Sequence, residues 1–257
     1  MMTSKPDATT TGAMTGDFPI KAMIFAAGRG ERMRPLTDTC PKPLLEAGGK
    51  PLIVWQIERL AQAGFATIVI NHAWLGEQIE AALGDGSRWG VRLAYSAEGV
   101  ALETAGGIAQ ALPLIENDGE PQVFAAVSGD IYCDFDYARL YEPARRLAAM
   151  AQPGMHLVMV PNPPFHPGGD FALADGRLSL DGSPRYTFGN IALYDTRMFR
   201  DLPCGERRAL TPYYRETIGA ARASGELYEG RWENVGTPHQ LRALDAALSV
   251  PLQGDTL

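Results

Sequence analysis

The chain has 257 residues, enough for one large α/β domain or two small domains. Hydrophobic residues make up 46% and charged residues 21%, a globular composition that excludes a disordered chain, a collagen and a coiled-coil rod. Thirty acidic and twenty-three basic residues leave a net charge of −7, so we expect no nucleic-acid partner. A local basic cluster can still bind a small phosphorylated ligand.

The cysteines and the hydropathy pattern indicate the cellular compartment in which we expect the protein. Cys40, Cys133 and Cys204 are odd in number and far apart, which favours the reducing cytoplasm over an oxidising compartment. No apolar run approaches the roughly 18 residues of a membrane span, so no membrane partner is expected. Residues 1–19 are polar and small and lack the apolar core of a signal peptide, so we predict a flexible tail there.

From residue 20 onward, the first half of the chain alternates between strands and helices. The expected strands, rich in apolar residues, cover 22–27, 66–70, 91–95 and 123–127. The expected helices cover 51–64, 75–83, 104–112 and 136–150. This alternation predicts a parallel sheet with helices on both faces, in which ligands bind at the carboxyl ends of the strands. Gly28, Asn71 and Asp130 follow strands at that edge.

The second half predicts a partly antiparallel lobe. Asp175-Gly176 joins two short strand-like segments and is a strong hairpin signal. The other expected elements are strands at 155–160 and 186–194, helices at 210–223 and 237–248, and short strands around 227–234. We therefore predict a single doubly wound, Rossmann-like α/β domain over residues 20–250, with a mixed, mainly parallel sheet.

A glycine loop rich in positive charge follows the first predicted strand. Its sequence at 28–34, GRGERMR, lacks the third glycine of the dinucleotide fingerprint, and no Walker lysine follows it. Backbone N–H groups of such a loop can wrap phosphates. Arg29, Arg32 and Arg34 lie in this loop and Lys42 follows between two prolines, so four cations suit a triphosphate. A surface turn with solvated arginines is the alternative.

The segment 26–53, AAGRGERMRPLTDTCPKPLLEAGGKPLI, resembles the signature of the sugar-phosphate nucleotidyltransferases, a GxGxRMxPLT loop followed by PKPL. The resemblance continues through SGDIYCDFD and WENVGT and covers residues 21 to about 248. The stretches NHAWLG, GDGSRWG and LETAGG resemble the branch that uses UTP and N-acetylmuramate 1-phosphate in peptidoglycan recycling. Branches that pair mannose 1-phosphate with GTP, or glucose 1-phosphate with dTTP or UTP, stay open, as does a non-catalytic nucleotide-sugar sensor.

The resemblance implies a GT-A-like fold, with a nucleotide-binding half at about 20–135 and a sugar-binding half at about 136–250. It also implies a Mg²⁺-dependent reaction, in which a sugar 1-phosphate attacks the α-phosphorus of a nucleoside triphosphate and pyrophosphate leaves. Such chemistry depends on positioning and charge neutralisation. We expect the chain to act as a monomer.

The resemblance assigns catalytic roles to Arg32 and Lys42, which would neutralise the triphosphate, and to Asp130, which would hold Mg²⁺. Asn234 in WENVGT would be the second metal ligand, at a position where many relatives have Asp. Because an amide brings no charge, metal affinity without nucleotide should be weak. Each metal ligand also has a local alternative: Asp130 could cap the helix near 134–136, and Asn234 could be a turn residue.

Nucleotide contacts are expected near the end of the first strand. The candidates are Ala26, Ala27, Gly28, Gly30, Asn71, Glu98 and Gly106. Glu98 would accept a hydrogen bond from the N3–H of uracil, although a solvated loop glutamate is the common alternative. Gly106 or Gly107, which lack a side chain, would permit the nucleobase to come close to the backbone.

The sugar 1-phosphate is expected over the second half. The candidates are Asp170, which follows a glycine pair, and Asn190, which lies inside an apolar strand. An amide in such a strand needs a hydrogen-bond partner, which could be sugar or backbone. The sequence does not select the cation that would meet a carboxylate on the sugar; the scattered candidates are Arg88, Arg185, Arg215 and Arg231.

Overall fold

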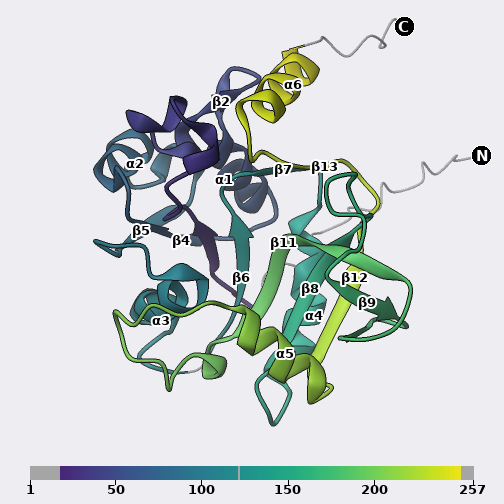
Figure 1. The fold of residues 1–257 in the computed structure, drawn as a ribbon. Helices are drawn as coiled ribbons and strands as arrows, with labels where there is room; N and C mark the ends of the chain where they lie inside the picture. Colours follow the sequence, from purple (N-terminus) through teal and green to yellow (C-terminus); the bar gives the residue numbers. More distant parts are fainter. Residues whose placement is uncertain (1–17, 121, 250–257) are drawn as a thin grey trace, which may run out of the picture.

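The computed structural model describes residues 18–120 and 122–249. Most of the predicted tail at 1–19 therefore lies outside the described residues. The described part is built on one large mixed sheet with helices on both faces (Figure 1). None of the helices in this part of the chain is long and apolar enough to cross a membrane.

The main sheet has nine strands in the order β5-β4-β1-β6-β11-β8-β12-β10-β9. The first half of the chain contributes β1 (Ala22–Phe25), β4 (Thr67–His72), β5 (Arg92–Ala97) and β6 (Val123–Ser128), all parallel. The second half contributes β8 (Met155–Val160), β9 (Phe171–Ala174), β10 (Arg177–Ser179), β11 (Arg185–Asp195) and β12 (Ala223–Leu227). Strand β11 runs antiparallel to both β6 and β8, so it joins the two halves. The predicted mixed α/β fold is confirmed.

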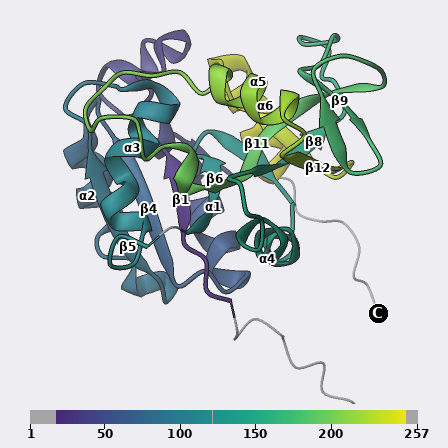
Figure 2. The ribbon, with the colours of Figure 1, turned by 90° about the horizontal axis from the view of Figure 1, so that it is seen from below.

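Helices cover both faces of this sheet. Their bounds are α1 (Leu52–Gln62), α2 (Gly76–Leu83), α3 (Glu103–Ile115), α4 (Tyr141–Ala148), α5 (Thr211–Gly219) and α6 (Pro238–Ser249). Alternate residues of β1 show the division: Ile24 belongs to the buried cluster that contains residues of α1, α2 and α4, whereas Met23 belongs to the cluster that contains residues of α3 and α5. Figure 2 shows α1 and α4 on one side of the strands and α3 and α5 on the other. Burial on both faces explains the continuous apolar strand sequences.

Helix α6 belongs to a third, smaller cluster. Leu241 and Leu244 of α6 pack with Met33 of the glycine loop and with Tyr132. This cluster holds the start and the end of the described chain together above the carboxyl edge of the sheet (Figure 1). Met33 therefore anchors the glycine loop to buried side chains, whereas Arg29, Arg32 and Arg34 of the loop stay exposed.

Three features differ from the sequence prediction. The helix expected at 136–150 begins as a 3-10 helix at Tyr137–Leu140, and α4 covers only Tyr141–Ala148. The helix expected at 210–223 ends at Gly219, because Ala221 has a φ of +54° and the N–H of Arg222 closes the end on the carbonyl of Thr217 (2.9 Å). The third feature is a separate ladder between β7 (Ile131–Cys133) and β13 (Trp232–Asn234). It consists of three-residue strands, too short to give a period in the sequence.

Candidate functional site

Three cavities that share wall residues form one cleft along the carboxyl edge of the parallel strands. The strand-end cavity, about 350 Å³, is lined by the ends of β1 and β6. The middle cavity, about 400 Å³, shares Phe25, Glu103, Thr104 and Ser128 with it. The lobe cavity, about 670 Å³, shares Phe188, Asn190, Thr211 and Tyr214 with the middle one. The cleft therefore runs from the first half of the chain into the second.

The strand-end cavity contains a hydrogen-bonded network at the ends of β1 and β4. The side-chain oxygen of Asn71 accepts from the N–H of Ala26 (3.0 Å), and its amide donates to Glu98 (2.6 Å). The other Glu98 oxygen accepts from the N–H of Leu102 (2.8 Å). These partners orient Asn71 and Glu98 toward the cavity, and each carboxylate oxygen keeps a lone pair for a ligand.

Burial raises the pKa of Glu98, and the hydrogen bonds from Leu102 and Asn71 oppose that rise. The carboxylate is therefore held in a partly desolvated position by specific donors. A solvated loop glutamate would have neither feature, so the structure favours a binding role for Glu98.

Gly107, and not Gly106, lies against this network. A Cβ on Gly107 would stand 2.4 Å from the Glu98 oxygen and 2.8 Å from the Asn71 amide. A Cβ on Gly106 would instead meet the carbonyl of Glu206 at 2.3 Å. The structure thus places the two neighbours on different faces of α3, as the turn of about 100° per residue requires.

Lys42 and Asp130 form an ion pair at the wall of the strand-end cavity. Lys42 lies in a short 3-10 helix after Pro41, and its side chain is only 10% exposed. A lysine this buried needs an anionic partner, which Asp130 supplies. The cap of the following helical segment is Asp136, whose side chain accepts from the N–H of Ala138 (3.0 Å). The capping alternative for Asp130 is therefore not supported.

The four cations of the glycine loop do not gather at one point. Lys42 lines the cavity, whereas Arg34 pairs with Asp38 at the surface (3.1 Å). Arg29 lies over the ring of Trp74, 5.2 Å from its centroid. Arg32 is exposed and lies close to Gly236. The predicted cluster of four is therefore reduced to Lys42 at the cavity wall, with Arg32 near the end of β13.

The remaining glycine-loop predictions divide in the same way. The backbone of Ala26, Ala27 and Gly28 lines the strand-end cavity. Gly30 has a φ of +65° and packs against Lys42 and Thr37, so it shapes the loop.

The short ladder between β7 and β13 brings Asn234 beside Asp130. Asn234 pairs with Ile131, and the N–H of Val235 donates to the carbonyl of Asp130 (3.0 Å). One carboxylate and one amide oxygen fit Mg²⁺, which keeps several waters and binds through substrate phosphates. No group of three or more His, Cys, Asp or Glu residues suited to hold a metal occurs within 18–120 or 122–249. The residues present therefore fit a metal that arrives with a nucleotide.

Asp170 and Asn190 both line the lobe cavity. Asp170 accepts from the N–H of Phe188 (2.7 Å) and lies 3.1 Å from the ring nitrogen of His166. Asn190 lies at an irregularity where β11 shifts register against β8, and its φ of +58° is rare for a residue with a side chain. Within the described residues the Asn190 amide has no protein hydrogen-bond partner, so the backbone alternative is not supported and the side chain is available in the lobe cavity.

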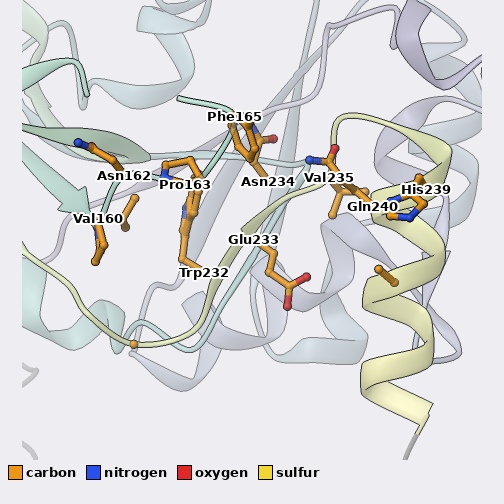
Figure 3. A pocket seen from close by; sticks show the side chains of 13 residues that line it. Val160, Asn162, Pro163, Phe165, Trp232, Glu233, Asn234, Val235, His239 and Gln240 are labelled. Carbon is orange, nitrogen blue, oxygen red and sulfur yellow. The ribbon is translucent and has the colours of Figure 1, made fainter. Parts of the chain in front are cut away.

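A side cavity of about 460 Å³ adjoins the lobe cavity (Figure 3). The two cavities share Phe165, Trp232 and Asn234. The indole N–H of Trp232 donates to the carbonyl of Gly189 (2.8 Å), which fixes the ring at the bulge of β11. Figure 3 shows Asn234 next to Phe165, with His239 and Gln240 on α6 at the far side. Asn234, the candidate metal ligand, therefore lies between the side cavity and the lobe cavity.

Comparison with known proteins agrees with this geometry. Residues 21–164 match the family model described as Nucleotidyl transferase. The chain belongs to this nucleotidyltransferase family.

Individual members of the family align over most of the chain. It is 49% identical to N-acetylmuramate alpha-1-phosphate uridylyltransferase of Neisseria meningitidis serogroup B, over 88% of this chain and 97% of the relative. A relative of the same name from Caulobacter vibrioides is 32% identical over 90% and 98%. Mannose-1-phosphate guanyltransferase of Aspergillus fumigatus is also 32% identical, over 85% of this chain and 61% of the relative.

The fold of the nucleotidyltransferase family is also seen in solved structures. A putative glucose-1-phosphate thymidylyltransferase from Bacillus anthracis superimposes with a TM-score of 0.77 at 20% identity, covering 92% of this chain and 98% of that one. At that identity the likeness concerns the fold alone.

Three site features of this nucleotidyltransferase were missed from the sequence. Arg207 comes from the second half, yet it lines the strand-end cavity and pairs with Glu103 (2.8 Å). Gly107 was named only as an alternative to Gly106. Tyr214 lines two of the three cavities. Arg207 and Tyr214 follow no strand end and belong to no motif, and the LETAGG stretch does not distinguish Gly107 from Gly106, so only the folded chain could identify these roles.

Proposed function

We propose that the chain is a Mg²⁺-dependent uridylyltransferase that converts UTP and N-acetylmuramate 1-phosphate into the UDP-sugar and pyrophosphate. Its place would be peptidoglycan recycling in the cytoplasm. The observation that carries the proposal is the continuous cleft, which joins a phosphate-type site at Lys42 and Asp130 to a second cavity large enough for a sugar. The 49% identity over nearly the whole Neisseria relative supports the choice of substrates.

The strand-end cavity would bind the nucleotide. The backbone at 26–28 would meet the base and phosphates, and Asn71 and Glu98 would read the base edge through their remaining donor and acceptor sites. Lys42 would leave Asp130, bind the triphosphate and neutralise its charge. Arg32 of the glycine loop would add a second positive charge. Uracil suits this arrangement because its N3–H can donate to a carboxylate.

Asp130 and Asn234 would hold the metal. Bound Mg²⁺ would neutralise phosphate charge and help to align the α-phosphate with the attacking oxygen. In the nucleotide-free protein Asp130 is already paired with Lys42, and Asn234 brings no charge. The carboxylate becomes available when Lys42 turns to the triphosphate, so metal binding would depend on the nucleotide.

The lobe and middle cavities would bind the sugar 1-phosphate. Asn190 lines both cavities, and its amide has no protein partner among the residues at 18–120 and 122–249. Asp170, anchored by Phe188, would accept hydrogen bonds from sugar hydroxyls. The sugar would then point its phosphate along the cleft toward the α-phosphorus, the in-line geometry that such a transfer requires.

We also propose one domain over 20–250 and a monomeric enzyme. A single sheet runs through both halves, and Arg207 of the second half reaches the cavity of the first. The nucleotide-binding half at about 20–135 and the sugar-binding half at about 136–250 would therefore not separate. Sedimentation at micromolar concentration tests the monomer.

The function is tested by pyrophosphate release with Mg²⁺, for each of UTP, GTP, dTTP, CTP and ATP. Each nucleotide is paired with the 1-phosphates of N-acetylmuramate, N-acetylglucosamine, glucose and mannose. We expect one dominant signal, from UTP and the muramate sugar. Dominance of GTP with mannose 1-phosphate, or of a thymidylyl or uridylyl transfer to glucose 1-phosphate, would replace the substrates and keep the chemistry. Silence with every pair would favour a nucleotide-sugar sensor without turnover.

A further inference from the structure

The lobe cavity carries a cation that the site described above does not use. Thr211, Tyr214 and Arg215 of α5 all line this cavity. Their spacing of three and four residues places them on one face of the helix. Arg215 is therefore on the face of α5 that borders the cavity, and its side chain is exposed there.

Arg215 has no protein partner within the described part of the chain, whereas the other arginine of this cavity is fully engaged. Arg185 donates from all three guanidinium nitrogens to backbone carbonyls, those of Gly168 (3.3 Å), Leu180 (2.8 Å) and Asp170 (2.5 Å). It therefore holds the hairpin β9–β10 against β11.

Elsewhere on α5 the charges are also matched. Arg222, just beyond the helix, pairs with Glu216 (3.2 Å) and donates to the carbonyl of Pro153. The unmatched guanidinium of this region is the one that borders the cavity.

The negative charge in the lobe cavity is already occupied by protein donors. Asp170 accepts from the N–H of Phe188, and its other oxygen faces His166. Among the described residues, the charged group of this wall that lacks a partner is thus a cation. A neutral sugar offers no charge to such a group, whereas a carboxylate binds a guanidinium in a bidentate, charge-assisted pair.

The same comparison separates Arg215 from the two remaining candidates for a carboxylate contact. Arg88 lies over Trp89, 3.8 Å from its ring centroid, and donates to the carbonyl of Ala82. Arg231 pairs with Glu233 (2.8 Å) and lies over Tyr132. Neither is among the residues that line the lobe cavity.

We propose that Arg215 binds the carboxylate of an acidic sugar 1-phosphate and so makes the enzyme select that sugar over its neutral analogue. This inference rests on the proposed function. In N-acetylmuramate the carboxylate belongs to a lactyl ether on C3, two carbons away from the anomeric carbon that carries the phosphate. N-acetylglucosamine is the same sugar without this ether. Arg215 would therefore read the one group that distinguishes the two substrates.

The test compares Arg215→Met with the wild type on the 1-phosphates of N-acetylmuramate and N-acetylglucosamine, each with saturating UTP and Mg²⁺. We expect kcat/KM for the muramate sugar to fall about 10- to 30-fold, mostly through KM, because a partly exposed charge-assisted contact is lost. The value for the glucosamine sugar should change by less than about threefold. Arg215→Lys keeps the charge and should recover part of the preference.

Arg177→Met is the matched control, since Arg177 is exposed on β10 and is not one of the lining residues. It removes the same charge and should leave both sugars unchanged. Calorimetric binding of UDP-N-acetylmuramate and UDP-N-acetylglucosamine gives a readout without turnover, and Arg215→Met should weaken only the first.

Two results would overturn the inference while the proposed function stands. An equal loss for both sugars would mean that Arg215 meets the shared phosphate or only supports the fold. An unchanged preference for the muramate sugar over the glucosamine sugar would mean that Arg215 does not contact the carboxylate. A wild-type enzyme that does not prefer the muramate sugar would instead refute the proposed function, and Arg215 would have no preference to explain.

Discussion

The two ends of the cleft differ in how their polar side chains are bonded within the protein. In the strand-end cavity, polar groups that follow parallel strands satisfy one another: Asn71 holds Glu98, and Lys42 holds Asp130. In the lobe cavity, the side chains of Asn190 and Arg215 have no protein partner within the described residues. The first end is organised before any ligand arrives, whereas the second leaves Asn190 and Arg215 available beside residues that are already bonded, such as Asp170 and Arg185.

This difference has a structural origin. The strand-end groups come from neighbouring parallel strands and their loops, which repeat the same geometry wherever such a sheet occurs. The lobe groups come from a bulge in β11, from the hairpin β9–β10 with its flanking loops, and from helix α5, whose geometry does not follow from the parallel sheet. The proposed nucleotide site therefore lies at the ends of parallel strands, and the proposed sugar site lies on the bulge, the hairpin and α5.

The largest effect is expected when the ion pair between Lys42 and Asp130 in the strand-end cavity is removed. Lys42→Met should lower kcat/KM for pyrophosphate release by about 100-fold or more, about 3 kcal/mol, because the triphosphate loses its buried cation. Lys50→Met is the control, since Lys50 pairs with Glu58 and lies over Trp55 outside the cleft. A loss below about threefold would remove Lys42 from the site.

Breaking the network of the same cavity should affect the nucleotide alone. In Gly107→Ala the new Cβ would lie 2.4 Å from the Glu98 oxygen, so Glu98 and Asn71 must move. We expect KM for UTP to rise about tenfold, with KM for the sugar phosphate nearly constant. Gly219→Ala, at the end of α5 with open space around it, should change neither value. A rise in both constants would show that the two ends are not independent.

Metal binding tests the strand-end cavity in a second way, because Lys42 neutralises the Asp130 carboxylate before the nucleotide binds. Mn²⁺, as a probe for Mg²⁺, should bind the nucleotide-free protein weakly. Lys42→Met frees Asp130 and Asn234→Asp adds a charge, so each should raise the affinity about three- to tenfold. The paramagnetic resonance signal of unbound Mn²⁺ measures this directly. Unchanged binding in both variants would contradict the metal role of Asp130 and Asn234.

The smallest effect concerns Glu98. Because burial raises its pKa, the folded protein binds this proton more tightly than the unfolded chain does. The free energy of unfolding should therefore fall as the pH rises from the ordinary value of 4.5 through the raised value. In Glu98→Gln that titration is absent, so Tm should depend less on pH there than in the wild type.

Glu77→Gln, at the exposed start of α2, is the control for the loss of one carboxylate. Melting curves from about pH 4 to pH 7 measure both variants. An identical slope in the wild type and in Glu98→Gln would mean that Glu98 is not desolvated in solution.

Most of the secondary structure could be predicted because burial leaves a local trace. The apolar runs at β1, β4 and β6 identified strands covered on both faces, and Asp175-Gly176 identified the hairpin β9–β10. Asn71 and Asp130 could be placed at the cleft because the carboxyl ends of parallel strands meet at one edge. These predictions needed only the order of elements along the chain.

Contacts between distant segments could not be predicted in this way. The ladder between β7 and β13 pairs residues about one hundred positions apart, through strands too short to show a period. It decides that Asn234 lies beside Asp130. The rotation of α3 decides that Gly107, and not Gly106, meets Glu98. Both outcomes depend on how whole elements pack.

The sequence by itself determined the α/β fold, the glycine loop, and the strand-end positions of Asn71 and Asp130, because periodicity and motif spacing are local properties of the chain. Only the tertiary structure decided which charges are matched. It paired Lys42 with Asp130, dispersed the loop arginines and left Arg215 without a partner in the described chain. The reason is physical: a charge acts over a few ångströms of space, and that distance is set by packing between elements that are far apart in sequence.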